Sequence, residues 1–109
     1  MLKTAVPVEQ IVREAIEFLT RTVSVDAVVL FGSQISGEAD ESSDIDVAVI
    51  SDELVRMPFR EQIKLFSRAI MAVDVRLEFH LYSCSDYLNP PQGSFLRLIK
   101  NTGRVLKLN

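Results

Sequence analysis

The chain has 109 residues, of which 48% are hydrophobic, and this size suits one compact domain spanning residues 1–109. Its 12 basic and 15 acidic residues give a net charge of −3 without any basic tract, which excludes a general nucleic-acid binder. The single cysteine, Cys84, excludes an intrachain disulfide and favours a reducing compartment, and we interpret it as a packing residue rather than a catalytic thiol.

The N-terminal stretch MLKTAVPVEQIVREAI is amphipathic and is charged within its first ten residues. Such a stretch is typical of neither a signal peptide nor a membrane span, so we expect a cytoplasmic protein with no membrane contact. Apolar residues from Val8 to Leu19 recur at helical spacing and predict an amphipathic helix over residues 8–22.

Two apolar runs follow, separated by a turn of small residues. DAVVLF, residues 26–31, is rich in β-branched residues, which predicts a central strand buried on both faces. Gly32 ends this strand, and the small polar residues 33–43 predict a loop or a short turn of helix. DIDVAVI, residues 44–50, predicts the second strand.

A helix and a third strand are predicted next. Apolar residues from Phe59 onward recur at helical spacing and predict a helix over residues 59–72, which Pro58 introduces. VDVRLEFHLYS, residues 73–83, alternates between apolar and polar side chains. This alternation predicts a strand with one dry face and one wet face.

The end of the sequence predicts a loop, a helix and a strand. NPPQGS, residues 89–94, predicts the loop, and Phe95 and Leu98 predict a short helix that stops at Gly103. RVLKL, residues 104–108, predicts the last strand. The order of these elements predicts an α+β domain with a small mixed β-sheet and helices packed on one face.

Two aspartates interrupt the second apolar run. Asp44 and Asp46 lie two positions apart and face away from the helices, whereas Ile45, Val47 and Val49 face them. Residues at this spacing on a strand project in parallel, roughly 6.5 to 7 Å apart, so two carboxylates can bind one or two divalent cations between them. Without a cation the two negative charges repel, so a metal ion explains the pair.

The most suitable ion is Mg²⁺, which is usually bound by one or two carboxylates together with substrate phosphates. The turn after the first strand offers a phosphate site, because Gly32 lets a phosphate approach the backbone amides and the Ser33 hydroxyl can donate a hydrogen bond. Ser43, which precedes Asp44, is a further candidate nucleotide-binding residue.

A third acidic group on a neighbouring strand would complete the metal site and accept the proton of an attacking hydroxyl. Glu78 and Asp74, both on the wet face of residues 73–83, are the candidates, and strand alternation alone does not choose between them. We interpret His80 as a half-exposed strand residue rather than a ligand.

Gly32 and Ser33, then ten residues, then Asp44 and Asp46 as Asp-x-Asp, resemble the signature of the minimal nucleotidyltransferases of the DNA polymerase beta superfamily. The tail RLEFHLYSCSDYLNPPQGSFLRLIKNTGRVL is similar to the tail that many of these small proteins carry. The resemblance implies the polymerase beta-like fold. It also favours Glu78 as the third carboxylate, because in this tail an acidic residue is followed two positions on by histidine.

This resemblance implies a reaction and a partner. The reaction is Mg²⁺-dependent transfer of a nucleoside monophosphate, with ATP as the expected substrate, to a hydroxyl group with loss of pyrophosphate. The partner is a helical protein of the HEPN class, which pairs with the transferase as toxin with antitoxin. In that scheme the transferase adenylylates a tyrosine of the toxin ribonuclease and silences it.

Alternative functions stay open. The chain carries Gln34, Ile35 and Ser36 where many relatives have arginines, which favours a catalytically weak module that neutralises its HEPN partner by contact alone. A subunit of a small-molecule transferase is a third hypothesis, although we expect no second domain to bind the small molecule. In each case the open face of the sheet predicts a cover, supplied by a homodimer or by a partner chain.

Overall fold

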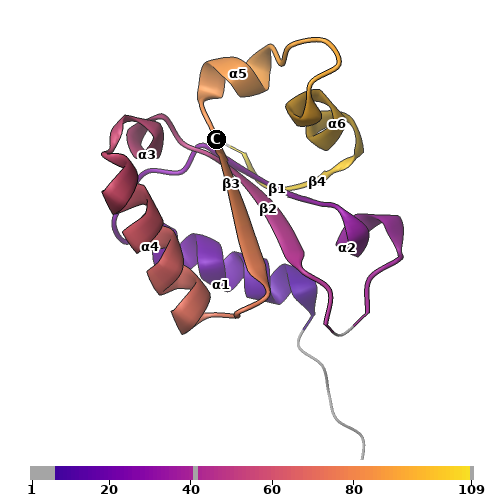
Figure 1. Ribbon diagram of the computed structural model, residues 1–109, viewed down its shortest axis with the longest axis horizontal. Coiled ribbons are helices and arrows are strands. Elements are labelled where there is room, and N and C mark those ends of the chain that lie inside the picture. Colours follow the sequence, from indigo (N-terminus) through magenta and orange to yellow (C-terminus); the bar gives the residue numbers. More distant parts are fainter. Residues whose placement is uncertain (1–6, 41, 109) are drawn as a thin grey trace, which may run out of the picture.

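A mixed β-sheet forms the centre of the computed structural model, which describes residues 7–40 and 42–108. Its strands are β1 (Ala27–Phe31), β2 (Ile45–Ile50), β3 (Leu77–Tyr82) and β4 (Arg104–Leu108), in the order β3-β2-β1-β4. β1 runs antiparallel to both β2 and β4, whereas β2 and β3 run parallel (Figure 1). The mixed sheet predicted from the sequence is confirmed.

Two long helices, α1 (Val8–Thr20) and α4 (Phe59–Ala72), lie on one face of the sheet (Figure 1). The helix predicted over residues 59–72 is confirmed at both ends. Buried side chains of α1 and alternate residues of β2 meet in this core: Ile11, Val12, Ala15 and Leu19 pack with Ile45, Val47 and Val49. Because successive strand residues face opposite sides, Asp46 and Ala48 point to the other face.

The expectation that the helices pack on one face holds for α1 and α4 only. Two further helices, α5 (Cys84–Leu88) and α6 (Phe95–Thr102), lie on the opposite side of the sheet (Figure 1). Their buried side chains form a second core with β1 and β2: Tyr87, Leu96 and Ile99 pack with Ala27, Val29, Phe31, Ala48 and Ile50. The physical reason is β1, whose residues are all buried, so that both of its faces need cover.

The short helices have weaker sequence patterns. α2 (Ser33–Ser36) agrees with the predicted loop or short turn of helix, whereas α3 (Asp52–Arg56) and α5 are not predicted. Both unpredicted helices begin with a serine cap. The hydroxyl of Ser51 accepts from the amide three residues on at 3.0 Å, and the hydroxyl of Ser83 does the same at 3.2 Å.

β3 begins at Leu77 and not at Val73, so the predicted strand over residues 73–83 is too long. Residues 73–76 form a turn after α4, in which the Leu77 amide donates to the Asp74 carbonyl at 3.2 Å. The alternation continues through this turn by coincidence. Val75 belongs to the apolar half of the pattern, yet it is 78% exposed.

Part of the sequence analysis concerns residues that the structure does not describe. Residues 1–6 of the N-terminal stretch and Glu41 of the predicted loop lie outside the described residues. Within the described residues α4 is the longest helix, with 14 residues, whereas a membrane span needs about 20. None of the described helices has the length and apolar composition to cross a membrane.

Gly103, between α6 and β4, tests the packing of the second core. A Cβ at this position would lie 2.4 Å from Val29 Cγ1 and 2.6 Å from the Ile99 carbonyl oxygen. Because neither group can move freely, we expect Gly103→Ala to lower the free energy of unfolding by about 1 to 3 kcal/mol in urea denaturation. Asn101→Ala, at an exposed position of the preceding helix α6, is the control, and equal stability of the two variants would contradict this packing.

Candidate active site

A glycine turn ends β1 directly beneath a carboxylate. Gly32 has φ 80° and ψ −149°, a backbone conformation that residues with a side chain rarely adopt. A Cβ at this position would lie 2.5 Å from Asp46 Oδ2. The position therefore needs glycine both for its conformation and for the close approach of Asp46.

The register of three strands brings two carboxylates together beside this turn. Phe31 pairs with Asp46 across β1 and β2, which places Asp46 next to the residue that follows Phe31. Asp46 pairs in turn with Glu78 across the parallel strands β2 and β3. Paired residues on strands about 4.8 Å apart project to the same face, so Asp46 and Glu78 are neighbours.

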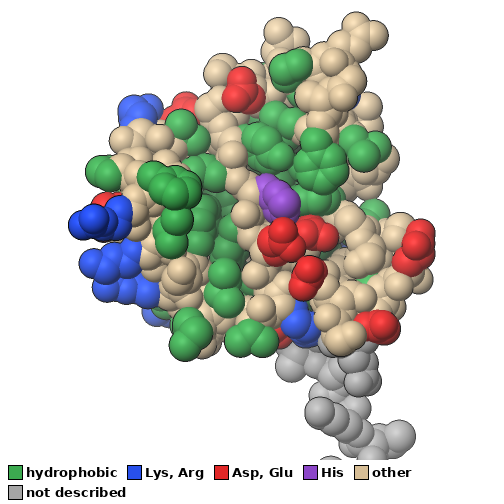
Figure 2. All heavy atoms as spheres, viewed as in Figure 1, with side chains coloured by type: hydrophobic (Ala, Val, Ile, Leu, Met, Phe, Trp, Pro, Cys, Tyr) green, Lys and Arg blue, Asp and Glu red, His purple; other side chains and the backbone are tan. Residues whose placement is uncertain are grey.

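His80 lies next to these two carboxylates. Its sequence pattern is interpreted only as that of a half-exposed strand residue. Its Nε2 lies 3.5 Å from Asp46 Oδ1 and 3.8 Å from Glu78 Oε1. Its ring packs edge-on against Phe31, with the ring centroids 5.0 Å apart. The sequence signal was the acid-x-His spacing, which places Glu78 and His80 on one face of β3. Figure 2 shows acidic side chains gathered beside the histidine, with hydrophobic side chains on both sides.

Asp44 occupies a different position from Asp46. It lies just before β2 and is exposed, and its carboxylate is outside the group of described ligand atoms that Asp46, Glu78 and His80 form within 4.8 Å of one another. The carbonyl oxygen of Asp44 accepts a hydrogen bond from Gln34 Nε2 at 3.2 Å. Gln34 thus ties α2 to the start of β2, and metal binding by Asp44 stays a prediction.

The two serines predicted to bind nucleotide lie in different settings. Ser33 is the first residue of α2, and the amides of Ile35 and Ser36 donate to the Gly32 carbonyl at 3.0 and 3.1 Å. The amides of Ser33 and Gln34 come before these two bonds, where a helix offers its own amides no acceptor. The Ser43 hydroxyl accepts from the Asp40 amide at 2.9 Å and closes a turn. Hydrogen bonds from Ser42, and then from Ser43, hold the pKa of the Asp40 carboxyl below its usual value. Nucleotide binding by Ser43 stays a prediction.

Asp74, the other candidate for the third carboxylate, is hydrogen-bonded to Arg76. Its Oδ1 accepts from the Arg76 amide at 2.8 Å and from Arg76 Nε at 3.1 Å, and its Oδ2 accepts from Arg76 Nη2 at 3.0 Å. The side-chain hydrogen bond from Arg76 is the main cause of the lowered pKa of Asp74. Asp74 therefore holds the turn before β3, and the geometry favours Glu78 beside Asp46.

The chemistry of this donor set fits Mg²⁺. Two carboxylates converge from neighbouring strands and offer the hard oxygen ligands that this cation prefers, while phosphate oxygens would complete its shell. Imidazole is a softer donor that suits zinc, copper and iron better. His80 Nε2 is buried without a hydrogen-bond partner among the described residues, and it faces Asp46. Asp46 and Glu78 thus fit the metal, with His80 beside them.

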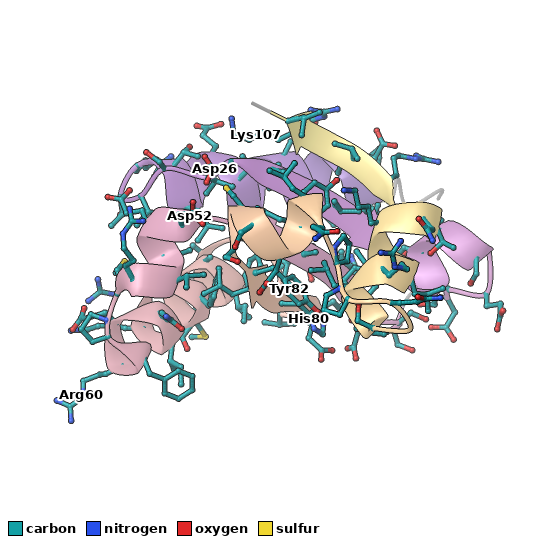
Figure 3. All side chains as sticks on the ribbon, turned by 90° about the horizontal axis from the view of Figure 1, so that it is seen from above. Asp26, Asp52, Arg60, His80, Tyr82 and Lys107 are labelled. Atoms are coloured by element: carbon teal, nitrogen blue, oxygen red, sulfur yellow. The ribbon has the colours of Figure 1, made fainter. Side chains whose placement is uncertain are left out.

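A second acidic cluster lies away from this site, and Figure 3 shows Asp26 and Asp52 close together and apart from His80. The Cys84 amide donates to Asp52 Oδ1 at 2.9 Å, and the Asp52 amide donates to Asp26 Oδ2 at 3.4 Å. Burial and the neighbouring aspartates raise the pKa of the Cys84 thiol to about 11. The raised pKa makes the thiol a poor nucleophile, and the two backbone hydrogen bonds give the cluster a structural role that fastens the start of β1, α3 and α5 together.

The fold and the site together define a class of enzyme, the nucleotidyltransferases. Residues 13–107 match the family described as Polymerase beta, Nucleotidyltransferase, and the chain belongs to this family. A protein of Methanocaldococcus jannaschii named "Putative protein adenylyltransferase" is 32% identical over 80 residues, which cover 72% of this chain and 76% of that protein. The predicted polymerase beta-like fold and the predicted enzyme class are confirmed.

A solved structure from Sulfolobus solfataricus supports the fold independently. It is described as a "putative nucleotidyltransferase" and matches with a TM-score of 0.58 over 72% of this chain and 69% of that chain. The two sequences are 18% identical, so the match concerns the fold alone.

The contact between Gly32 and Asp46 can be tested with a matched pair of glycines. Gly32 and Gly37 both have positive φ, but a Cβ at Gly37 would meet nothing within 4 Å. Alanine is expected to cost about 1 to 2 kcal/mol of stability at Gly37, whose backbone is left-handed helical, and about 1 to 3 kcal/mol at Gly32, whose φ and ψ only glycine adopts readily. Only Gly32→Ala should also weaken binding of Mg²⁺-ATP, by about tenfold or more, because Asp46 must move. Equal affinities of the two variants in calorimetry would contradict the contact.

The raised pKa of Cys84 predicts that its thiol reacts slowly with alkylating agents. At pH 8 a thiol with a pKa of about 11 is roughly a hundredfold less ionised than an ordinary cysteine. Iodoacetamide should therefore alkylate the folded protein about a hundredfold more slowly than the guanidinium-unfolded chain, and the rate should rise as the pH approaches 11. Equal rates for the folded and unfolded protein at pH 8 would contradict the structural role of Cys84.

Proposed function

We propose that this nucleotidyltransferase transfers AMP from ATP to a tyrosine hydroxyl of a helical partner of the HEPN class, and thereby acts as the antitoxin of that partner. The observation that carries the proposal is the Asp46 carboxylate above the Gly32 turn, with Glu78 on the adjoining strand. The M. jannaschii relative is named as a protein adenylyltransferase, which supports ATP as the donor and a protein as the acceptor.

The residues of the site have separate tasks in this proposal. The amides after Gly32 and the hydroxyl of Ser33 bind phosphate oxygens of ATP. Asp46 and Glu78, together with Asp44, hold Mg²⁺, which when bound neutralises charge on the phosphates and on the leaving pyrophosphate. His80 lies beside them, with Nε2 3.5 Å from Asp46 Oδ1 and 3.8 Å from Glu78 Oε1.

The chemical step is an in-line displacement. The tyrosine oxygen attacks the α-phosphorus of ATP, a new P–O bond forms, and the bond between the α-phosphorus and the bridging oxygen breaks to release pyrophosphate. Glu78 suits the base that accepts the tyrosine proton, because its side chain is 53% exposed at the edge strand β3. An incoming hydroxyl can reach Glu78 from outside the sheet.

An exposed apolar surface lies on α4, across the sheet from Asp46 but next to the edge strand β3 that carries Glu78, and it supports a protein partner. On α4, Phe59 is 73% exposed, Ile63 48% and Met71 82%. The same helix is tied to the strand of Glu78, since Phe66 stacks on Phe79 with centroids 4.8 Å apart. Large apolar side chains exposed together often mark a protein interface, so a partner on α4 would bring its tyrosine to the edge strand.

Incubation of the protein with labelled ATP, Mg²⁺ and a HEPN-class protein encoded by an adjacent gene tests the proposal in one reaction. The expected result is a partner protein whose mass increases by AMP on tyrosine. Asp46→Asn is expected to abolish the adduct, and Glu78→Gln to slow its formation by about 10² to 10⁴-fold, the usual contribution of a general base. Asp74→Asn, a carboxylate outside the site, should leave the rate close to that of the wild type.

Thermal unfolding of each variant separates a damaged site from a damaged fold. A tight complex that forms without any adduct, and that survives Asp44→Asn and Asp46→Asn, would overturn the proposed reaction. That result would support neutralisation of the partner by contact alone.

A further inference from the structure

Basic side chains form a stripe along the outer side of α4. Arg60, Lys64 and Arg68 recur at every fourth residue, a spacing that places side chains one above another on the same side of a helix. All three are exposed, and none forms an ion pair within the part of the chain that the structure describes. Figure 3 shows Arg60 pointing away from the rest of the molecule. On a chain with a net charge of −3, this basic stripe is a local positive region.

An apolar stripe, Phe59 and Ile63, runs beside the basic stripe on the flank of α4 that faces β3. The two side chains lie one turn apart and are 73% and 48% exposed. Phe66, on the same side of the helix one turn further, stacks on Phe79 of the edge strand β3. Figure 2 shows hydrophobic side chains between the basic ones and the histidine. The apolar stripe thus lies between the basic stripe and the edge of the sheet that carries Glu78.

The two stripes together require a partner with apolar and acidic groups side by side. A nucleic acid would neutralise the basic stripe but would leave Phe59 and Ile63 in water. A lipid bilayer takes up apolar side chains that project outermost, whereas here Arg60 projects outward and the apolar stripe lies on the flank towards β3. Aromatic side chains and arginine are enriched at protein–protein interfaces, which favours a protein.

The straight course of both stripes along α4 suits a helix. On a partner helix, carboxylates four residues apart recur with the same rise of about 6 Å as Arg60, Lys64 and Arg68, and packed helices cross at small angles that keep such rows aligned. An apolar row on the next side of the partner helix would then meet Phe59 and Ile63. The matching chemistry is an amphipathic helix with one acidic side.

We infer that the α4 surface docks an acidic amphipathic helix of the acceptor protein, whose apolar side covers Phe59 and Ile63 and whose carboxylates pair with the basic stripe. This inference rests on the proposed function, because it names the contact that holds the acceptor. Since α4 packs on the face of the sheet opposite to Asp46, docking leaves the Gly32 turn open to nucleotide. The docked protein reaches Glu78 around the edge strand β3.

Calorimetry with a HEPN-class protein encoded by an adjacent gene tests the charge of the docking surface. Arg60→Glu is expected to lower the affinity about tenfold, because attraction becomes repulsion. Arg13→Glu, at an exposed arginine of α1 outside both stripes, makes the same change of charge and should leave the affinity within about twofold. The wild-type affinity should fall as NaCl rises from about 50 to about 500 mM, and more steeply than that of Arg60→Glu.

Dissociation rates test the apolar stripe. Phe59→Ala and Ile63→Ala are each expected to raise the dissociation rate about tenfold, because both side chains are covered in the complex. Leu88→Ala, at an apolar residue that is 73% exposed on α5, across the sheet from α4, should leave the rate unchanged. The affinity for α,β-methylene-ATP with Mg²⁺ should stay the same in all of these variants, which separates loss of docking from a damaged site.

Exchange of charge identifies the docked helix. Lysine in place of the acidic residues on that helix of the partner should weaken binding to the wild type and restore binding to Arg60→Glu. Failure of every acidic helix of the partner to do so would overturn the inference. Sedimentation of the free protein with vesicles of phosphatidylcholine and phosphatidylserine, lost in Arg60→Glu and in Phe59→Ala, would assign the surface to a membrane and would also overturn it.

The possible results distinguish this inference from the proposed function. If the HEPN-class protein gains AMP but binds every α4 variant as tightly as the wild type, the docking surface is wrong and the proposed reaction stands. If it binds with the expected dependence on α4 and gains no AMP, the proposed reaction fails and the docking surface stands. If it neither binds nor gains AMP, both fail.

Discussion

The Asp46 carboxylate lies so close to the end of β1 that a methyl group at Gly32 would fall 2.5 Å from Asp46 Oδ2. This contact follows from the pairing of Phe31 with Asp46, and the parallel pairing of Asp46 with Glu78 adds the second carboxylate. The Gly32 turn and both carboxylates are therefore placed by the central sheet. Groups on rigid strands keep their separations better than groups on loops, as a site for metal and phosphate requires.

The sheet also holds two like charges close together at the site. Asp46 and Glu78 carry like charges on neighbouring strands, and their repulsion is unfavourable until a cation binds. Asp46 cannot withdraw, because Ile45 and Val47 on either side of it are 0% and 1% exposed in the core. The side-chain amide of Gln34 donates to the Asp44 carbonyl at 3.2 Å. The chain thus uses this position to hold β2 in place, and in the proposed function a cation would compensate the charge of the carboxylates.

The sequence predicts the parts of this arrangement that depend on local periodicity. The apolar runs predict β1 and β2, helical spacing predicts α4, and alternation places Asp46 on the face opposite Ile45 and Val47. Pairing between distant strands is not local, so alternation cannot decide between Asp74 and Glu78, whereas the β2–β3 register places Glu78 beside Asp46. The same register places His80 beside Asp46, on the same face of β3 as Glu78. The cover that α5 and α6 give to the second face depends on tertiary packing, which no local pattern reports.

The most direct measurement is a crystal structure of the protein with Mn²⁺ in place of Mg²⁺ and a non-hydrolysable ATP analogue, with the metal located by its anomalous signal. The account predicts an anomalous peak bound by Asp46 and Glu78, with a phosphate oxygen shared between the metal and the amides that follow Gly32. A metal bound at Asp26, Asp52 and Cys84 instead, or phosphates held away from the Gly32 turn, would contradict it.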